Sequence, residues 1–441
     1  MRFTFSIKWQ LCLLWCCGMW LSCSPQLKQY ALRPSDIIRP ETVTLPTSGS
    51  GINNPCINPN NYAPDSNYIN HTTMRYLRIN LHFLNSSDSS RNFDEKLGRE
   101  FAHTLVNASN HWLQNNQKMF LPLHNTTPAL PTQIQYVITP CDTIPNDDGI
   151  YFHYNDTLSN FNKRNHGRIK RADDIYSTRQ FDNYAISPDK VLNIFLMEHP
   201  RDSVVSPTYK ASSDGVGLYN WVKVVACYQF YQQKHFPTWG DVAWFATGIM
   251  NHEIGHSLGL MHTWSGGDGC DDTPNNPNCW NVAPGVCDSL LSNNVMDYNA
   301  WRNAYTPCQI GKMQYNFWLE GSPQRSRAVP KWCEYQPNAP IIVPRGKTLV
   351  WNCGKDVESD IIIQDRAQLI INCPLSMPKG SRIIVATTAQ LIINNTVINN
   401  RCGDEWKGIV IERMGKQRGK VALIGNAKLE NITGFEALMP R

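Results

Sequence analysis

The segment from His252 to Trp264 carries three histidines and a glutamate at a spacing that suits metal chemistry. His252 and His256 stand four residues apart, so a helix would place both imidazoles on one face, one turn apart. Glu253 would be turned by about 100° from His252 around the helix, where it can reach a water molecule without being a ligand. His262 can supply a third nitrogen. Three neutral imidazoles with an open fourth position are typical of catalytic zinc, which activates water.

Gly259 gives the segment a way to bring its third histidine back. Glycine adopts a positive φ at little cost, so Gly259 can end the helix and turn the chain sharply. A lone His-x-x-x-His pair is more often structural than metal-binding. The full pattern HExxHxxGxxH, however, would arise by chance in a chain of this length with odds on the order of one in ten thousand. We therefore predict a zinc site with His252, His256 and His262 as ligands and Glu253 as general base and acid.

The full pattern resembles the signature of the metzincin metallopeptidases, whose members also carry a methionine in a tight turn downstream. Here the segment NNVMDYNAW places Met296 in that position, with Tyr298 two residues later. The segments GLMHTW, DDTP and YTPCQIGKMQ are similar to the pappalysin/cytophagalysin branch, a family of secreted zinc endopeptidases (peptidase family M43-like). The similarity is dense over 239–317, looser back to about residue 73, and absent from the C-terminal part.

The resemblance implies roles for two residues of the turn. Met296 would be the Met-turn residue beneath the metal, although simple core packing is the plainer interpretation. Tyr298 would lie near the metal, as a switchable ligand or as a phenol that donates a hydrogen bond to a developing oxyanion. A buried tyrosine bonded to backbone is the alternative for Tyr298.

The N-terminus has the pattern of an export signal. Arg2 and Lys8 precede the apolar run WQLCLLWCCGMWLSC, which is too short for an ordinary membrane-spanning helix and is followed by polar sequence. Trp20–Cys23 resembles a bacterial lipobox, although Trp20 replaces the usual aliphatic residue. We expect 1–23 to be a signal peptide, with Cys23 either lipidated, which would attach the chain to a membrane, or lost by simple cleavage. The expected location is extracellular or on the cell surface.

Export makes disulfides the default for the cysteines that follow. Four of them bracket the Met-turn: Cys270, Cys279, Cys287 and Cys308. A structural zinc site is the alternative to disulfides, and sequence alone allows three pairings. The family resemblance favours Cys270 with Cys287 and Cys279 with Cys308.

The acidic residues Asp268, Asp271 and Asp272 offer oxygen ligands that could suit calcium, as in some relatives. An ordinary solvated loop is the other interpretation. The basic run KRNHGRIKR is followed by Asp173 and Asp174 and has no interleaved aromatic residues, so we expect no nucleic-acid partner.

The length of 441 residues suggests two or three domains. Residues 24–72 are rich in Pro, Asn, Ser and Thr and are predicted to be a linker or a short pro-segment. Within them, Cys56 could plug the zinc site, or it could pair with another cysteine such as Cys141.

Residues 73–330 are predicted to form one metzincin-like peptidase domain of α/β (α+β) class. MRYLRINLHFL alternates like a strand, and IQYVIT, VLNIFLME and WVKVVACYQF have the apolar density of further strands. Apolar residues from Leu97 to Trp112 recur at helical spacing, and a second helix is expected from about Trp239 through His256. The result would be a twisted central sheet with an active-site helix, and a helix is also expected to start at Thr306 and Pro307.

Residues 335–441 repeat a short strand. AQLIIN at 367–372 recurs letter for letter 22 residues later, TLVWNC precedes it at a similar interval, and AKLEN at 427–431 echoes the same unit. A period near 20 residues predicts stacked coils, most simply the start of a right-handed parallel β-helix. A small β-sandwich is the alternative. The pattern stops at the final MPR, which suggests a truncated sequence or a poorly capped array.

Two functions follow from these features. The first is a secreted or surface-anchored zinc endopeptidase acting on protein or peptide substrates, held by strand addition to the edge of WVKVVACYQF or a neighbour. The second is a surface adhesion or glycan-binding protein in which the coils contact carbohydrate and proteolysis is secondary. The sequence does not name the substrate.

Overall fold

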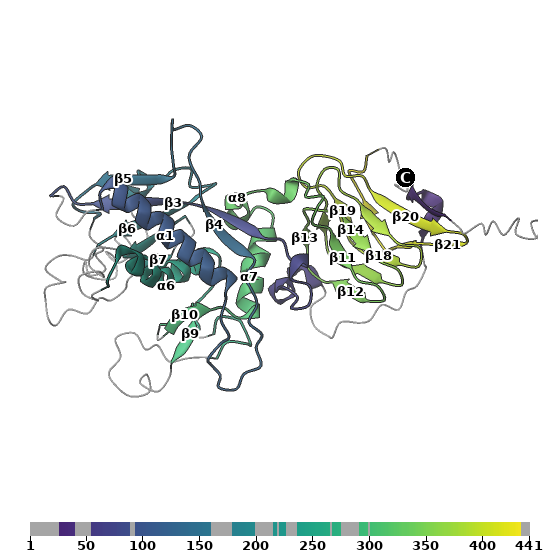
Figure 1. Ribbon diagram of the computed structural model, residues 1–441, viewed down its shortest axis with the longest axis horizontal. Coiled ribbons are helices and arrows are strands. Elements are labelled where there is room, and N and C mark those ends of the chain that lie inside the picture. Colours follow the sequence, from purple (N-terminus) through teal and green to yellow (C-terminus); the bar gives the residue numbers. More distant parts are fainter. Residues whose placement is uncertain are drawn as a thin grey trace, which may run out of the picture.

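The computed structural model describes residues 26–39, 54–88, 93–159, 179–198, 215–217, 220–225, 236–264, 267–274, 291–298 and 300–433. In these ranges the chain forms a helix-and-sheet domain and, beside it, a stack of short strands (Figure 1). None of the described helices is long and apolar enough to cross a membrane.

A mostly parallel sheet forms the centre of the first domain. Its strands run in the order β4 (Ile134–Ile138), β3 (Arg75–Asn85), β6 (Leu192–Met197), β8 (Trp221–Val225) and β7 (Gly215–Gly217), and β5 (Ile150–Tyr154) also pairs with β3. All pairs are parallel except that of β7 with β8. The predicted strand of the MRYLRINLHFL segment is confirmed, since Leu77, Ile79, Leu81 and Phe83 are all buried.

Two helices pack together against this sheet. Helix α1 (Glu95–Gln114) buries Phe101, Leu105 and Ala108, and its Gly98 lies close to Phe83 and Phe152 of the sheet. Helix α6 (Trp239–Ser257) contacts α1, β7 and β8. Thr238 and Asp241 form a capping box that starts α6. Both predicted helices are therefore confirmed.

Short elements complete the domain. Helix α3 (Arg179–Asp182) lies between β5 and β6 in the chain. Strands β9 (Ser292–Asn294) and β10 (Ala300–Ala304) stand on either side of the Met-turn, which is followed after β10 by α7 (Pro307–Trp318), α8 (Pro323–Arg327) and η7 (Lys331–Cys333). The side chain of Thr306 accepts a hydrogen bond from the Gln309 N–H, and Pro307 occupies the first helical position, so the predicted start of α7 is confirmed.

The C-terminal part contains three parallel ladders, each receiving one strand from every coil. The first contains β11 (Ile341–Val343), β14 (Ile361–Ile363), β17 (Ile383–Val385) and β20 (Ile409–Met414). The second contains β12 (Thr348–Trp351), β15 (Gln368–Ile371), β18 (Gln390–Asn394) and β22 (Lys420–Ile424). The third contains β13 (Lys355–Asp356), β16 (Leu375–Ser376), β19 (Val397–Asn399) and β23 (Lys428–Leu429).

The repeated AQLIIN segments lie directly above one another in the second ladder. Leu369 pairs with Leu391 and Ile371 with Ile393, and all four side chains are buried between the ladders. No single coil could bury these side chains alone, which is why the repeat and the stacking go together.

The prediction that AKLEN repeats the AQLIIN strand is wrong. Lys428 and Leu429 of that segment belong to β23 in the third ladder, and the partner of QLIIN is instead KVALI of β22. The last coil is longer because β20 continues into an antiparallel hairpin with β21 (Gln417–Arg418) before β22 begins.

Residues 27–38 pair with the last coil, whereas the sequence predicted a linker or pro-segment. Strand β1 (Leu27–Ala31) runs antiparallel to β20, and β2 (Ile37–Ile38) pairs with β22, with the turn η1 (Pro34–Asp36) between them. Leu32 is buried among the apolar side chains of the coils. Such pairing satisfies backbone groups that the last coil would otherwise expose.

Residues 54–71 pack against the first two coils, at the end of the stack opposite to β1 and β2. They form η2 (Pro55–Ile57), η3 (Pro59–Tyr62) and η4 (Ile69–His71). Cys56 makes a disulfide with Cys373. The alternative that Cys56 plugs the zinc site is therefore wrong. The alternative that it pairs with another cysteine is confirmed, although the partner is Cys373 and not Cys141, which is a free cysteine.

The two domains are joined by a buried charge cluster. The carboxylate of Asp356 in β13 lies 3.0 Å from Arg75 and 2.7 Å from Arg325, and both guanidinium groups lie over the Trp332 ring. A disulfide between Cys333 and Cys402 crosses the same boundary.

Candidate metal centre

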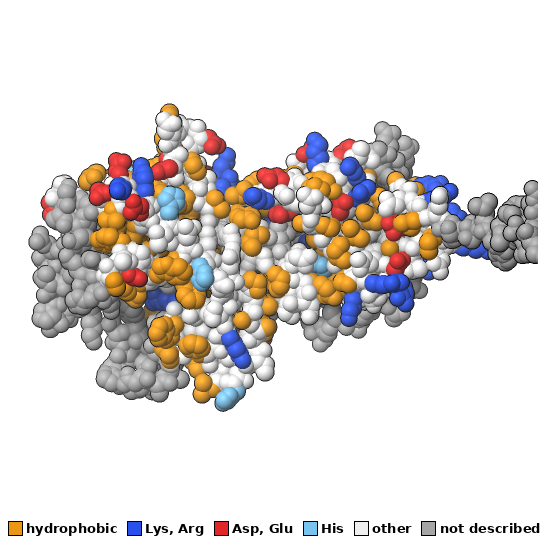
Figure 2. Space-filling view, in the orientation of Figure 1, with side chains coloured by type: hydrophobic (Ala, Val, Ile, Leu, Met, Phe, Trp, Pro, Cys, Tyr) orange, Lys and Arg blue, Asp and Glu red, His pale blue; other side chains and the backbone are white. Residues whose placement is uncertain are grey.

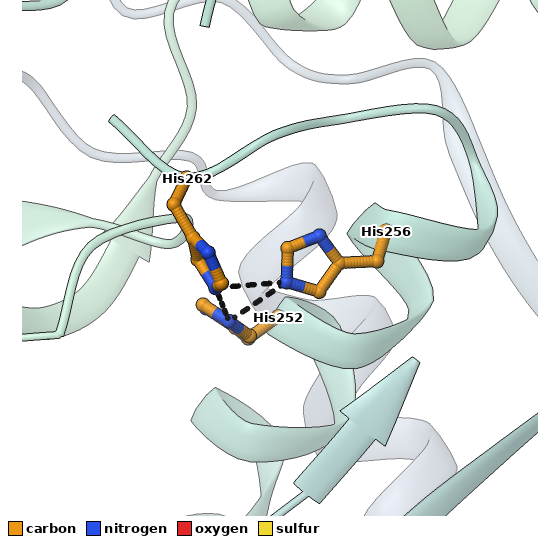
Figure 3. Close-up of side chains that lie close together, drawn as sticks. All are labelled: His252, His256 and His262. Carbon is orange, nitrogen blue, oxygen red and sulfur yellow. Dashed lines mark hydrogen bonds between the residues drawn. The ribbon is translucent and has the colours of Figure 1, made fainter. Parts of the chain in front are cut away.

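The three histidines of the HExxHxxGxxH segment converge on one point (Figure 3). The Nε2 atom of His252 lies 3.2 Å from that of His256 and 3.2 Å from that of His262, and the Nε2 atoms of His256 and His262 are 3.0 Å apart. His252 and His256 come from successive turns of α6, as their spacing predicted, and His262 approaches from the loop that follows.

Backbone carbonyls fix the tautomer of two rings. The Nδ1 of His252 donates to the Val295 carbonyl at 2.6 Å, and the Nδ1 of His256 donates to the Leu260 carbonyl at 2.9 Å. A carbonyl can only accept, so the proton of each neutral ring is on Nδ1 and the Nε2 lone pair points at the other rings. This is the arrangement in which metal-binding histidines are usually held.

Burial keeps all three rings neutral. Desolvation lowers the pKa of His252 and His256, and together with the nearby His256 and Arg302 it lowers the pKa of His262 to about 3. Neutral imidazole is the form that binds a metal ion.

The convergent lone pairs are what a cation would satisfy. Nitrogen atoms that face one another without a proton between them repel unless a positive charge lies between them. Tetrahedral zinc has Zn–N distances of roughly 2.0–2.1 Å, which corresponds to ligand nitrogens roughly 3.3–3.4 Å apart. The observed separations of 3.0–3.2 Å are close to this value, so the residues fit the metal.

Gly259 ends the helix as the sequence predicted. Its φ is +96°, and the N–H of Leu260 donates back to the carbonyl of Gly255 at 3.0 Å, in the manner of a Schellman cap. A side chain at Gly259 would also collide with the Asn316 amide, which donates to the Leu258 carbonyl. This tight reversal brings His262 back over the helix.

The Met-turn supports the centre through both backbone and side chain. Met296 is fully buried, and its sulfur lies against Gly255, where a Cβ would be only 2.7 Å away. Val295 provides the carbonyl that holds His252, and the Met296 carbonyl accepts from the Thr263 N–H at 3.4 Å. The turn is therefore in contact with the segments on both sides of the centre.

Two aromatic rings lie against His262. The Trp264 indole stacks on its imidazole, with centroids 4.8 Å apart and planes at 15°. The Tyr298 ring lies 4.7 Å from His262 and 5.8 Å from His252. The expected proximity of Tyr298 to the histidines is thus observed.

The carboxylate of Glu253 faces the edge strand β7. Glu253 is 7% exposed, and a Cβ on Gly215 would lie 2.6 Å from its Oε1 atom. A Cβ on Gly217 would collide with the Glu253 carbonyl. These two glycines allow β7 to approach α6 closely beside the histidines.

Both cysteine pairs implied by the resemblance are wrong. Cys270 is bonded to Cys308, which excludes the pair of Cys270 with Cys287 and the pair of Cys279 with Cys308. The bond connects the loop after His262 to the first turn of α7. Cys279 and Cys287 lie outside the described residues.

Carboxylate oxygens of Asp268 and Asp272 accept hydrogen bonds from within the protein. One oxygen of Asp268 accepts from the Cys270 N–H and the Thr273 hydroxyl, the other accepts from Gln309, and the Lys312 ammonium donates to the Asp268 carbonyl. Asp272 accepts from the Cys308 N–H at 3.0 Å, and Asp271 is exposed. The other oxygen of Asp272, Oδ1, is buried without a hydrogen-bond partner among the described residues, and calcium binding by this loop stays a prediction.

Several supporting groups had no sequence signal of their own. The carbonyls of Val295 and Leu260 are backbone groups that every residue has, so the residue types do not predict this role. The GVG of β7 could have been found only as an unusually glycine-rich strand, and Trp264 only as an aromatic residue next to a ligand.

The comparison with protein-family models agrees with the motif. The family model Peptidase_M43, described as pregnancy-associated plasma protein-A, matches residues 176–317. No curated protein matches the chain by sequence. Among solved structures, the chain is similar to mature mirolysin of Tannerella forsythia in complex with a cleaved peptide, with 18% identity and a TM-score of 0.36 over 58% of this chain and 96% of that one.

Two further mirolysin structures give comparable values. One is mirolysin in complex with a compound, and the other is a promirolysin mutant of Tannerella forsythia. Both have 17% identity and a TM-score of 0.36 over 58% of this chain, and the matches cover 96% and 84% of those chains. Residues 176–317, which include the three histidines, Gly259 and Met296, match the pappalysin family of metallopeptidases, as the sequence motif predicted.

Proposed function

We propose that this protein is a zinc-dependent endopeptidase with its centre at His252, His256 and His262. The observation that carries the proposal is the convergence of three Nε2 atoms within 3.2 Å of one another, two of which are kept unprotonated by carbonyls that bind the Nδ1 of the same ring. The family match favours this function over the alternative of an adhesion or glycan-binding protein.

When bound, zinc would polarise the scissile carbonyl and lower the pKa of a water molecule. The chain's own residues would do the rest. Glu253 would take the proton of the attacking water and pass it to the leaving amine as the peptide bond breaks. The phenol of Tyr298 would donate a hydrogen bond to the oxyanion that develops on the carbonyl.

The substrate would bind along β7. The expectation from sequence was the edge of β8 or a neighbour, but β8 lies between β6 and β7, and β7 is the last strand of this sheet in the described part of the chain. An extended peptide that added to β7 would have its backbone beside Glu253. Backbone hydrogen bonds would then place a peptide bond near the histidines without selecting one side chain.

Further features extend this proposal. We propose that the chain is exported, with 1–23 as a signal peptide and Cys23 as a lipidation site; the intact mass of the mature N-terminus would test both. We also infer that residues 335–441 form a right-handed parallel β-helix, which the three parallel ladders support. Carbohydrate binding by these coils stays a prediction from sequence.

The test is proteolysis of a denatured generic protein by the wild type, Glu253→Gln and His256→Ala, with zinc content measured on each. Glu253→Gln keeps the size of the side chain and should lower the rate by roughly 10²–10⁴-fold while zinc stays bound. His256→Ala should lose both zinc and activity, and a chelator should reproduce that loss in the wild type. Equal activity in Glu253→Gln and the wild type would exclude the mechanism, and cleavage only at chain ends would exclude an endopeptidase.

A further inference from the structure

The end of the coil stack that lies farthest from the first domain has an unusual arrangement of charges. There β1, β20 and β21 form a three-stranded antiparallel ribbon (Figure 1). Lys28 pairs with Arg413, and Arg413 pairs with Arg418. Residues directly opposite one another in a sheet point to the same face, so three cationic side chains lie side by side.

This row of cations is only partly neutralised within the chain. Arg418 lies 2.6 Å from Asp36, while Glu412 accepts from Gln29. All three cationic side chains are exposed, and Lys416 adds another in the turn between β20 and β21. Like charges placed opposite one another destabilise a sheet, so an anionic partner would remove a cost that the folded chain otherwise carries.

Two apolar side chains share the same end of the ribbon. Leu27 pairs directly with Met414, and they are 55% and 40% exposed. They alternate with Lys28 and Arg413 along their strands, so they point to the opposite face of the ribbon. Figure 2 shows Lys and Arg side chains at this end of the molecule. The ribbon tip, defined here as Leu27, Lys28, Arg413, Met414, Lys416 and Arg418, is therefore amphipathic.

We propose that the ribbon tip binds an anionic lipid surface. The tip would meet the surface end-on, so that the cations on one face of the ribbon contact the headgroups while Leu27 and Met414 on the other face enter the interface between headgroups and acyl chains. A soluble polyanion would use the cations but would leave the apolar pair in water, so the combination favours a membrane. The N-terminal apolar run ends at Cys23, and the first ribbon strand, β1, begins four residues later at Leu27.

The test is co-sedimentation of the full chain with neutral vesicles of phosphatidylcholine and with vesicles containing phosphatidylglycerol. We compare the wild type with Arg413→Gln/Lys416→Gln. The control, Lys347→Gln/Lys407→Gln, removes the same charge from exposed sites outside the ribbon tip. Each cation at the surface contributes roughly a fivefold factor in binding, so the tip variant should bind anionic vesicles roughly 25-fold more weakly and the control should match the wild type.

A second measurement reports contact at the tip itself, independently of any binding through the N-terminal apolar run. An environment-sensitive dye on Met414→Cys should shift to the blue with anionic vesicles, whereas the same dye on Lys407→Cys should not. Equal sedimentation of the tip and control variants together with an unchanged dye at position 414 would overturn the proposal. Binding to heparin or DNA that falls in Arg413→Gln/Lys416→Gln, with no dye response to vesicles, would identify a polyanion site instead.

Discussion

The three histidines are held in place by different means. Val295 and Leu260 orient His252 and His256 through their carbonyls, which also fix the proton on Nδ1. His262 has no such hydrogen bond from Nδ1 among the described residues; its ring is stacked on Trp264 instead. The Trp264 indole therefore orients the His262 ring, whereas backbone carbonyls orient the other two rings.

Replacing Trp264 by Ala should weaken zinc binding. An aromatic pair contributes about 0.5–1.5 kcal/mol beyond its buried area, so the zinc dissociation constant should rise roughly three- to tenfold. Trp264→Phe should restore most of the affinity because it keeps a stacking face. Chelator competition on the three proteins measures this, and equal affinity in Trp264→Ala and the wild type would mean that Trp264 does not position His262.

At the scale of elements, the centre depends on how closely one helix and one strand approach. Helix α6 supplies two histidines and Glu253, and the Met-turn passes beneath it where Gly255 leaves room for Met296. Strand β7 lies against the other side, where Gly215 and Gly217 have no Cβ. Both approaches require a glycine, because any larger residue would push the neighbouring segment away.

Gly217→Ala should reduce peptidase activity without removing zinc. Its Cβ would collide with the Glu253 carbonyl, so β7 must move away from α6 and the bound peptide would move with it. We expect kcat/KM to fall at least tenfold, as displacements of about 1 Å near a reacting centre can cost roughly 100-fold. Gly240→Ala, in the first turn of the same helix with a nearest contact of 3.4 Å, is the matched control and should be close to wild type.

If Gly217→Ala keeps full activity on a folded and an unfolded substrate alike, β7 is not the strand that holds the peptide. Zinc content of the variant must be measured alongside, since a loss of metal would indicate that α6 itself was distorted.

At the scale of the whole molecule, the coils and the first domain share one interface. Asp356 comes from the coils, and Arg75 and Arg325 come from the first domain. Burial alone would raise the pKa of the Asp356 carboxyl, but the two arginines outweigh it and lower that pKa. With the disulfides Cys56–Cys373 and Cys333–Cys402, this cluster makes the coils part of the folded body, so we expect a chain ending near residue 335 to be unstable.

Asp356→Asn should destabilise the protein strongly. It leaves two buried guanidinium groups without a counter-charge, which typically costs about 3–5 kcal/mol. Asp404→Asn breaks the exposed pair with Lys379 instead and should cost less than about 1 kcal/mol. Urea unfolding of both variants measures the difference, and similar losses for the two would show that the buried cluster contributes no more than a surface pair.

The interface should also weaken in acid through His71. Its ring nitrogen Nε2 donates to the Ile342 carbonyl at 3.1 Å, and burial, with a further effect from Lys355, lowers its pKa to about 4. The unfolded chain binds the proton more readily, so the stabilising contribution is complete above about pH 6.5 and is lost as the pH falls toward 4. The loss from this one group is about 3 kcal/mol.

The measurement is the free energy of unfolding between pH 7 and pH 4 for the wild type and His71→Gln, which keeps a donor for Ile342. The pH dependence should be shallower in His71→Gln, while His103→Gln, at an exposed site, should follow the wild type. If the free energy of unfolding falls equally with pH in all three proteins, groups other than His71 cause the acid sensitivity.

Local sequence determined the elements and the residues of the centre. The HExxH spacing, Gly259 and the apolar alternation of β3 act within one helix, turn or strand, so their geometry follows from backbone rules. The AQLIIN repeat likewise predicted stacked strands. Only the tertiary structure decided which distant groups meet: Cys270 with Cys308, Cys56 with Cys373, β1 with β20, and β7 with Glu253. These contacts join residues far apart in sequence, and pairing partners, backbone carbonyls and close approaches at glycine leave no local pattern from which they could be predicted.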